Sequence, residues 1–397
     1  MDNKIWEILG TATINAKALR RLESGHPWIY DSDIVDLPSD EPGFVEVRQE
    51  NKKRQGRLLG YAMFSPRSKI TLRMVTGPKV PPTAAWLDER IKRALAGRLR
   101  ALPEADAFRL IHGEADGLPG VYVDRYDDCV AVQTTCAAAD RLEECVIDQV
   151  IKEFHPRAVV IRDDVGSRRR EGLREHITVA YGQSPVLASF HEGTIALEVD
   201  LERDQKTGGF LDQSSNHIAC GHYARGRALD CFTYHGGFAL QMALGCDSVI
   251  AVDASATAVE RGQRNAAQAG LSNIEWINDN AFDLLRRYAD LQQQFDTIAL
   301  DPPAFASTKD THGRASNAYK EINLRALKLL APGGTLVTCS CSGRITADDF
   351  DAIIAAAARD AHKHVQILER RGAGPDHPVL VGMPETEYLK CRILAVV

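Results

Sequence analysis

The stretch LDCFTYHGGFAL, residues 229–240, reads as the end of an apolar strand, a turn and the beginning of a helix. From about residue 195 onward, apolar strands alternate with helical segments in the same way. The strands are expected within ALDCF, VIAVDA, IEWIND, FDTIALDPP and GTLVTCSCS. This alternation predicts parallel βαβ units in a doubly wound α/β sheet. Such sheets bind ligands beyond the carboxyl ends of their strands, so the residues that end each strand indicate the ligand.

The first two strand ends point to a nucleoside without identifying a dinucleotide. Gly236 and Gly237 open a helix but lack the spacing of G-x-G-x-x-G, which disfavours a dehydrogenase. They fit a close approach to a ligand and an ordinary tight turn equally well. Asp253 ends the next strand, where a carboxylate can accept hydrogen bonds from both ribose hydroxyls.

The later strand ends favour methyl transfer. Asn280 follows the third strand and could accept a hydrogen bond from an exocyclic amine. After the fourth strand, Pro302 and Pro303 fix an extended backbone and aim Asp301 at the ligand crevice. A nucleoside cofactor beside Asp-Pro-Pro indicates S-adenosylmethionine more than hydride transfer. The alternative is that Asp-Pro-Pro simply stops the strand.

The remaining chain predicts further domains, since 397 residues exceed the size at which a single core stops growing. Residues 1–76 form short alternating runs with Gly and Pro punctuation, which predicts a small β-rich domain. Residues 77–190 contain expected helices near 87–100 and 140–154 and the strand AVVIRDD, which predicts a central α/β domain. Residues 191–397 hold the doubly wound sheet.

Charge and cysteine content limit the function. The net charge of −6 does not indicate a nucleic-acid partner. Residues 48–73 are nevertheless locally basic. This run is either an RNA-binding face or a solvated hairpin. The nine cysteines show no C-x-x-C and no Cys/His cluster with zinc spacing, so no metal is expected. No signal peptide or membrane-spanning run is evident, which indicates reduced thiols in the cytoplasm.

Eight stretches in order resemble the large-subunit ribosomal RNA cytosine-5 methyltransferases of the RlmI type along nearly the whole chain. They are LRRLESGHPWIY (19–30), GEADGLPGVYVDRY (113–126), KTGGFLDQ (206–213), LDCFTYHGGFAL (229–240), VDAS (252–255), LDPPAF (300–305), YKEINLRALKLLAPGGTLVTCSCSG (319–343), and DHPV with YLK (376–379 and 388–390). The resemblance implies an amino-terminal PUA RNA-binding domain and a carboxy-terminal Rossmann-like methyltransferase domain.

The resemblance also implies the ligands and their residues. S-adenosylmethionine would be the cofactor and large-subunit ribosomal RNA the partner, with no membrane; a homodimer is compatible with it. The implied cofactor-binding residues are Phe210, Gln213, Asp230, Phe232, Gly236, Gly237, Asp253, Asn280 and Asp301. The candidate substrate-binding residues are Pro302, Phe305 and His377, the last equally suited to a structural turn, together with Lys52, Lys53 and Arg54 of the basic run. Three positions depart from the family: Ala304 replaces a lysine, and Ser214 and His217 stand where arginines are common.

The two thiols of LVTCSCSG, residues 336–343, have different expected roles. Cytosine carbon 5 is a poor nucleophile, and adding a thiolate to carbon 6 pushes electron density to carbon 5. In the family the cysteine of Ser-Cys-Ser-Gly acts, which maps to Cys341 and leaves Cys339 as a buried hydrophobe. Asp301 would hydrogen-bond the cytosine edge. The base must be single-stranded or flipped, with the basic run and Ser167–Glu171 around its phosphates.

Three alternatives remain. An exocyclic-amine methyltransferase has an aromatic residue directly after Asp-Pro-Pro, whereas Ala304 stands before Phe305 here, and its chemistry does not require a thiol. An RNA-binding assembly factor with a vestigial methyltransferase fold would bind the cofactor weakly or not at all. A small-molecule methyltransferase would leave the amino-terminal domain without a role.

Overall fold

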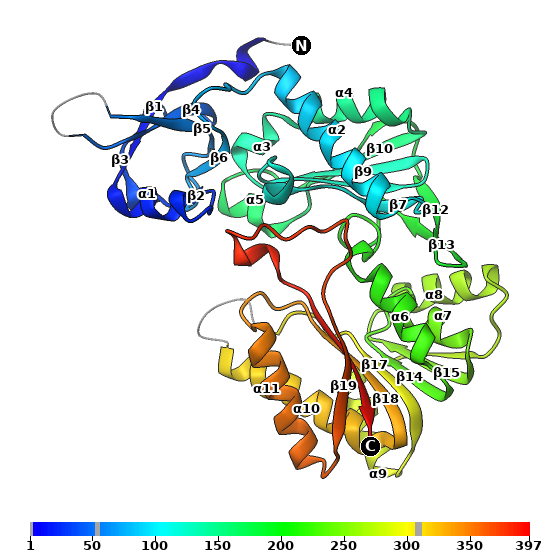
Figure 1. Ribbon diagram of the computed structural model, residues 1–397. Helices are drawn as coiled ribbons and strands as arrows, with labels where there is room; N and C mark the ends of the chain where they lie inside the picture. The colour runs from blue at the N-terminus through cyan, green and yellow to red at the C-terminus, as the bar shows by residue number, and fades with distance from the viewer. Residues whose placement is uncertain (1–2, 52–55, 306–311) are drawn as a thin grey trace. The chain divides into compact units, whose positions relative to one another are not determined.

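The computed structural model describes residues 3–51, 56–305 and 312–397 (Figure 1). The chain packs as two compact units. The first consists of Met1–Phe190, Val199–Gly209 and Pro375–Thr386, and the second of His191–Glu198, Phe210–Gly374 and Glu387–Val397. The first unit contains two separate sheets, one before and one after residue 76, so the predicted boundary there stays a prediction.

The first sheet of this unit contains six strands in the order β2-β6-β5-β4-β1-β3. Its strands are β1 (Ile8–Ile14), β2 (Trp28–Ile29), β3 (Ile34–Asp36), β4 (Gly43–Gln49), β5 (Leu58–Phe64) and β6 (Leu72–Thr76). The side chain of Asn15 caps helix α1 (Ala16–Glu23) by accepting hydrogen bonds from two backbone N–H groups. Alternate residues such as Val45, Val47 and Ala62 face a common core, as half-buried strands require.

The second sheet has the order β11-β10-β9-β8-β7. Its strands are β7 (Ala107–His112), β8 (Val121–Tyr126), β9 (Cys129–Thr134), β10 (Ala158–Arg162) and β11 (Ile177–Tyr181), and its helices are α2 (Ala84–Ala101), α3 (Ala137–Asp140), α4 (Glu143–Phe154) and α5 (Gly166–Arg170). The two helices expected from sequence correspond to α2 and α4. The hydroxyl of Thr83 caps α2, so the helix begins three residues earlier than its apolar pattern suggests.

Two of the basic residues considered for RNA binding are structural. Arg73 is buried, with its guanidinium 3.1 Å from Glu171. Arg168 is also buried and donates to Asp140 at 2.6 Å. The interpretation of Ser167–Glu171 as a phosphate-binding segment is therefore wrong for Arg168, because its guanidinium binds Asp140 inside the unit. Lys52, Lys53 and Arg54 lie outside the described residues.

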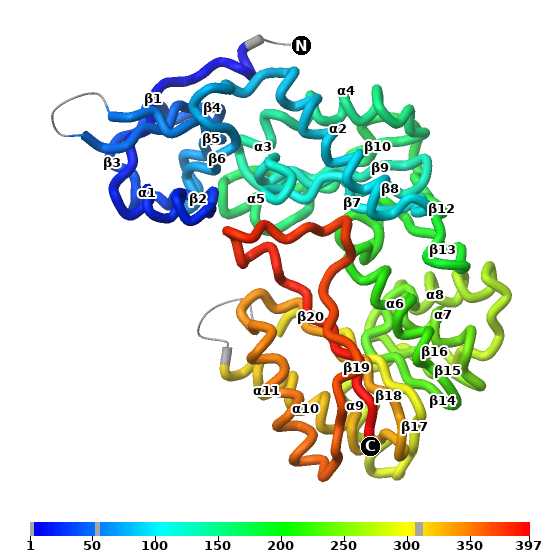
Figure 2. The backbone as a smooth tube through the Cα atoms, viewed as in Figure 1, coloured from blue at the N-terminus to red at the C-terminus, as the bar shows by residue number. Residues whose placement is uncertain are grey.

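The second unit is built on a seven-stranded sheet in the order β16-β15-β14-β17-β18-β20-β19. Its strands are β14 (Gly226–Cys231), β15 (Cys246–Asp253), β16 (Ile274–Asn278), β17 (Phe295–Leu300), β18 (Leu330–Ser340), β19 (Val365–Arg371) and β20 (Lys390–Val396). The five strands β14 to β18 are parallel to their neighbours within that group, and β20 lies antiparallel between β18 and β19. Figure 2 shows β20 near the red end of the trace, alongside β19 and β18. The predicted doubly wound sheet is confirmed.

Helices cover both faces of this sheet, as strand periodicity requires. They are α6 (Ser214–Tyr223), α7 (Gly237–Ala243), α8 (Ala256–Gln268), α9 (Ala281–Asp290), α10 (His312–Leu329) and α11 (Ala347–Asp360). Leu229 and Cys231 of β14 point to the core under α9, α10 and α11. Ala228, the residue before Leu229, belongs to the core under α6 and α7. A hairpin of β12 (Leu187–Glu192) and β13 (Ile195–Asp200) precedes the sheet.

No helix of the described residues is long and apolar enough to cross a membrane.

Candidate functional site

The predicted site residues of the second unit lie where its parallel strands end. Strand β14 ends at Cys231, β15 at Asp253, β17 at Leu300 and β18 at Ser340. Because these strands are parallel, their carboxyl ends share one edge of the sheet. The order reverses between β14 and β17, which are neighbours, so the switch point falls between Cys231 and Asp301. The Asp301 N–H donates to the Cys231 carbonyl at 3.4 Å.

The loop after β14 has an unusual backbone. Phe232 has φ of 66°, Tyr234 of 50° and Gly236 of 91°. For the two aromatic residues this left-handed conformation costs free energy and persists only where the surroundings enforce it, which is typical of functional loops. The enforcing contact comes from Asp253, whose Oδ2 accepts the Tyr234 N–H at 2.9 Å. Sequence reasoning selected Phe232 and missed Tyr234, because no residue type in this loop signals a positive φ except glycine.

The two glycines are required by packing inside the domain. Gly236 has a positive φ, and a Cβ there would lie 2.6 Å from the Trp276 ring. A Cβ on Gly237 would lie 2.3 Å from Cε1 of His217. These contacts favour the tight-turn interpretation of the pair over ligand approach as the reason for glycine.

Asp230 is a fully buried carboxylate with one unsatisfied oxygen. Its Oδ2 accepts from Thr233 Oγ1 at 2.5 Å and from the Ala239 N–H at 2.9 Å. Among the residues that the structure describes, Oδ1 has no hydrogen-bond partner. Burial raises the pKa of Asp230 to about 7, although the Thr233 hydroxyl and His217 act in the opposite direction. A buried acceptor without a donor suits a ligand that carries an N–H group.

Gln213 is a second buried polar side chain near the strand ends. Its Oε1 accepts from Asn216 at 2.6 Å, and its amide interacts with the Cys339 thiol, which is only a weak acceptor. Apart from that thiol, Nε2 has no hydrogen-bond partner within the described part of the chain. Phe210, just before this turn, packs edge-on against Tyr234 with ring centroids 4.8 Å apart. The KTGGFLDQ stretch thus brings two predicted cofactor residues to this edge.

Asp253 has the geometry expected of a ribose-binding carboxylate. Oδ1 accepts the Ser255 N–H at 2.8 Å, while Oδ2 accepts the Tyr234 N–H. Each carboxylate oxygen has a second acceptor position, so two ribose hydroxyls can still be bound. The internal bonds fix the orientation of the carboxylate before a ligand arrives.

Asn280 serves a structural role that sequence reasoning did not anticipate. Its Oδ1 caps α9 by accepting the N–H groups of Phe282 at 2.9 Å and Asp283 at 3.4 Å. The predicted hydrogen bond from an exocyclic amine would compete with this cap.

His217, one of the family departures, is buried against α7. Its Nδ1 lies 2.6 Å from Glu192 Oε1, and its ring packs on Phe238 at 4.4 Å. Burial alone would lower the pKa of His217, but Glu192, Asp301 and Asp230 together hold it above its ordinary value. These carboxylates therefore favour the protonated imidazole against the cost of its burial.

The Asp-Pro-Pro segment and Cys341 lie together. Pro302 is buried, and its carbonyl oxygen is 4.0 Å from Cys341 Sγ. Phe305 is half-buried and packs against Tyr319 and Phe282, with ring centroids 4.7 and 5.8 Å apart. The fold thus joins two segments that are 39 residues apart in sequence.

The thiols of LVTCSCSG differ in exposure. All nine cysteines lie among the described residues, where Cys341 is half-buried and the other eight are buried. Strand β18 ends at Ser340, so Cys339 lies within the strand and Cys341 lies just beyond it. Burial, together with the neighbouring Cys391, raises the pKa of Cys339 well above its ordinary value. Cys339 is therefore a protonated thiol in the core.

The neighbours of Cys341 are held in place. Ser342 Oγ lies 2.9 Å from the Tyr319 hydroxyl, and the Ser342 carbonyl accepts from Lys390 Nζ at 2.8 Å. Lys390 begins β20 opposite Ser340. Lys390 lies in the YLK stretch of the family resemblance, but no role was predicted for it, because the pairing of an antiparallel last strand with β18 has no sequence signature.

His377 belongs to the first unit. Its Nδ1 lies 3.0 Å from Asp376, and its ring packs against His112 with centroids 5.0 Å apart. These contacts agree with the structural alternative for this histidine.

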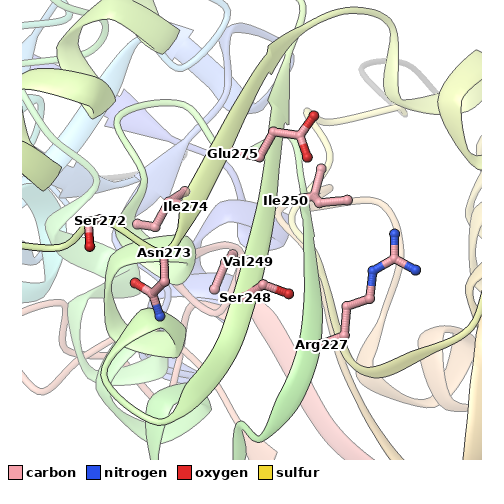
Figure 3. Close-up of a pocket in the computed structure, with 8 residues that line it drawn as sticks. All are labelled: Arg227, Ser248, Val249, Ile250, Ser272, Asn273, Ile274 and Glu275. Atoms are coloured by element: carbon pink, nitrogen blue, oxygen red, sulfur yellow. The ribbon is translucent and has the colours of Figure 1, made fainter.

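Two further features lie away from these residues. The pocket in Figure 3 is lined by Arg227, Ser248, Val249, Ile250, Ser272, Asn273, Ile274 and Glu275. These residues lie toward the amino ends of β14 to β16, opposite the edge described above.

In the first unit, Glu143, Asp163 and His176 bring possible metal-ligand atoms within 4.8 Å of one another. Arg168 forms an ion pair with Asp163, so this cluster already contains a cation.

Comparison with known proteins agrees with this arrangement. Residues 183–387 match the family model of S-adenosylmethionine-dependent methyltransferases, and residues 12–77 match a PUA-like domain. A solved structure described as a methyltransferase complexed with S-adenosylhomocysteine superposes with a TM-score of 0.84 at 19% identity, covering 98% of this chain and 100% of the other. A second, described as a SAM-dependent methyltransferase from Streptococcus mutans, gives 0.82 at 19% identity with the same coverage.

Curated relatives cover nearly the full length. The ribosomal RNA large subunit methyltransferase I of Shewanella denitrificans is 37% identical over 94% of this chain and 95% of its own. The protein of the same name from Klebsiella pneumoniae (strain 342) is 36% identical over 93% and 94%. The chain therefore belongs to the ribosomal RNA large subunit methyltransferase I family, with a PUA-like domain and an S-adenosylmethionine-dependent methyltransferase domain.

Proposed function

We propose that this enzyme forms 5-methylcytosine in large-subunit ribosomal RNA through a covalent adduct of Cys341. The observation that carries the proposal is the position of the half-buried Cys341 thiol, 4.0 Å from the Pro302 carbonyl of the Asp-Pro-Pro segment. The substrate follows from the names of the curated relatives, which are large-subunit ribosomal RNA methyltransferases. Supporting residues of the first unit are the exposed cations Arg57, Arg67 and Lys69 within the PUA-like region.

The cofactor fits the polar groups at the strand ends. Asp230 Oδ1 is a buried acceptor that needs a donor, and Gln213 Nε2 is a buried donor that needs an acceptor. The amino-acid end of S-adenosylmethionine carries an ammonium and a carboxylate, which would satisfy both groups. Asp253 would hold the ribose hydroxyls, and Phe232 with Tyr234 would shape the loop beside it. When bound, the cofactor supplies an electrophilic methyl group.

The chain's own residues would carry out the remaining chemistry. The Cys341 thiolate adds to carbon 6 of cytosine, forming an S–C bond and moving the electron pair of the double bond to carbon 5. Carbon 5 then takes the methyl group. Loss of the carbon 5 proton to a base restores the double bond and expels the thiolate. Asp301, which follows the strand beside β14, would hydrogen-bond the cytosine edge and fix its orientation.

Bisulfite sequencing of ribosomal RNA tests the proposal. A strain lacking this gene would be complemented with the wild type, Cys341→Ser or Cys339→Ser. We expect one large-subunit cytosine to resist conversion with the wild type and with Cys339→Ser, but not with Cys341→Ser. Retained methylation in Cys341→Ser would contradict the mechanism. Methylation of the exocyclic amine, detected by nucleoside mass spectrometry, would establish the alternative reaction, which requires no thiol.

A further inference from the structure

Lys390 is a buried cation at the beginning of β20. Its side chain is 4% exposed, although lysine is almost never fully buried without a charged partner. It is opposite Ser340, the last residue of β18, and thus one position before Cys341. The pairing of β20 with β18 therefore places Lys390 at the end of the strand that precedes Cys341.

The contacts of the ammonium are two carbonyl oxygens. Nζ donates to the Ser342 carbonyl at 2.8 Å and to the Tyr388 carbonyl at 2.7 Å. Among the described residues, no carboxylate lies within ion-pair distance of Nζ. An ammonium buried in this way lacks the counter-charge that normally offsets the cost of its desolvation.

The charged groups near Lys390 indicate which of them offsets the buried charge of its ammonium. Burial lowers the pKa of Lys390 to about 8, and the charge of Cys341 acts most strongly in the opposite direction. Arg392 lowers this pKa further, whereas Glu387 and Asp349 raise it more weakly than Cys341 does. A thiolate at Cys341 is therefore the principal negative charge that Lys390 senses.

We propose that the Lys390 ammonium stabilises the thiolate form of Cys341 and so prepares the nucleophile. The proton of the thiol is released to solvent, and the two carbonyl contacts fix the ammonium beside the strand end. Lys390 acts through Cys341 and is thus a positioning residue. This inference rests on the proposed function, because only a nucleophilic Cys341 needs a stabilised thiolate. The structural alternative is that Lys390 merely joins the Ser342 and Tyr388 carbonyls.

Alkylation of the protein without RNA or cofactor separates these roles. Iodoacetamide reacts with thiolates, and Cys341 is the cysteine that is not buried. The rate at Cys341, followed by peptide mass spectrometry across the range from mildly acidic to alkaline pH, gives its pKa. We expect a wild-type pKa below the ordinary value of about 8.5. We expect Lys390→Met to raise it by about one unit, which slows alkylation near neutral pH about tenfold.

Two controls keep the result interpretable. Lys390→Arg retains the cation and should keep the low pKa. Lys363→Met removes a lysine that also donates to a backbone carbonyl of this unit, that of Leu330 at 3.2 Å, and should leave the Cys341 profile unchanged. A folded Lys390→Met protein with the wild-type profile would overturn the inference. If Lys390→Met does not fold, a wild-type pKa at or above about 8.5 would overturn it by itself. If Cys341→Ser still methylates RNA, the proposed function itself is wrong. The alkylation assay does not measure methylation, so the two failures can be told apart.

Discussion

Individual side chains at the strand ends have structural roles, and for two of them we also propose ligand binding. Asp253 orients the loop after β14 while keeping acceptor positions for a ribose, and Asp230 holds the same loop through Thr233. Asp253 was predicted because it ends an apolar strand, and Asp230 was predicted because the family resemblance implies it. Their internal partners were not predictable, because backbone N–H groups carry no sequence signature. Asn280 shows the reverse case, in which a polar residue at a strand end is a helix cap.

Replacing Asp253 by alanine tests its two roles. We expect cofactor binding to weaken by about 1.5 to 3 kcal/mol, the range for hydrogen bonds to a charged group. Thermal stability should also fall, since the Tyr234 and Ser255 N–H groups lose their acceptor. Calorimetric titration with S-adenosylmethionine measures the first effect. Asp247→Ala, at the other end of the same strand, is the control. Equal affinity of Asp253→Ala and the wild type would remove Asp253 from the site.

Asp230→Asn tests the buried carboxylate through its pH dependence. The raised folded-state pKa, about 7, means that ionisation destabilises the folded protein progressively as pH rises from about 4 to about 7. Asparagine cannot ionise and keeps an oxygen for Thr233 and Ala239. We expect the stability of Asp230→Asn relative to the wild type to increase by roughly 1 to 3 kcal/mol between about pH 5 and about pH 8. Urea denaturation without cofactor measures it, and a pH-independent difference would show that Asp230 is not strained by burial.

At the scale of elements, hydrophobic periodicity predicted which segments form strands and helices, but it did not predict which segments pair or which side chains interact. The five parallel strands and the helices between them follow from alternating apolar runs, whose bounds are confirmed within a few residues. The last two strands were missed, since β19 and β20 are separated by a long segment that belongs to the first unit. Missing β20 meant missing Lys390, whose importance comes only from pairing with β18. Arg73 and Arg168 were misjudged for a similar reason, because their carboxylate partners Glu171 and Asp140 lie 98 and 28 residues away in sequence.

Cys339→Ser tests the division of the two thiols within β18. The Cys339 thiol is fully buried and faces Cys391 of β20, its partner in the strand register. A hydroxyl there would be desolvated beside a weakly polar neighbour, so stability should fall by about 1 kcal/mol. Methyl transfer measured with labelled S-adenosylmethionine should stay within about twofold of the wild type. Abolished turnover in a folded protein would assign the chemistry to Cys339.

At the scale of the whole molecule, the chain combines a PUA-like domain with a methyltransferase domain, and both were expected from the sequence resemblance. The relation of the RNA to these domains was expected only from local charge. The structure divides that charge into buried ion pairs and the exposed residues Arg57, Arg67 and Lys69. Sequence alone could not separate the buried basic residues from the exposed ones, because the residue type is the same in both environments.

Neutralising Arg57, Arg67 and Lys69 together tests the exposed group. Cations that neutralise phosphates release counterions on binding, so the triple alanine variant should bind ribosomal RNA fragments more weakly. The slope of log affinity against log salt should decrease by about 0.7 for each phosphate of single-stranded RNA that the variant no longer neutralises. Filter binding at several salt concentrations measures both. Lys92→Ala with Lys152→Ala removes exposed cations of α2 and α4 and serves as the control. An unchanged slope would show that the group is only solvated.

The central claim is that Cys341 attacks the base, and a mechanism-based trap tests it most directly. An RNA substrate with 5-fluorocytosine at the target position accepts the thiol and the methyl group but cannot lose its carbon 5 substituent as a proton. With S-adenosylmethionine present, we expect a stable protein–RNA adduct whose mapped peptide carries the nucleotide on Cys341. An adduct on Cys339, or an enzyme that methylates normal RNA yet never forms an adduct, would contradict the account.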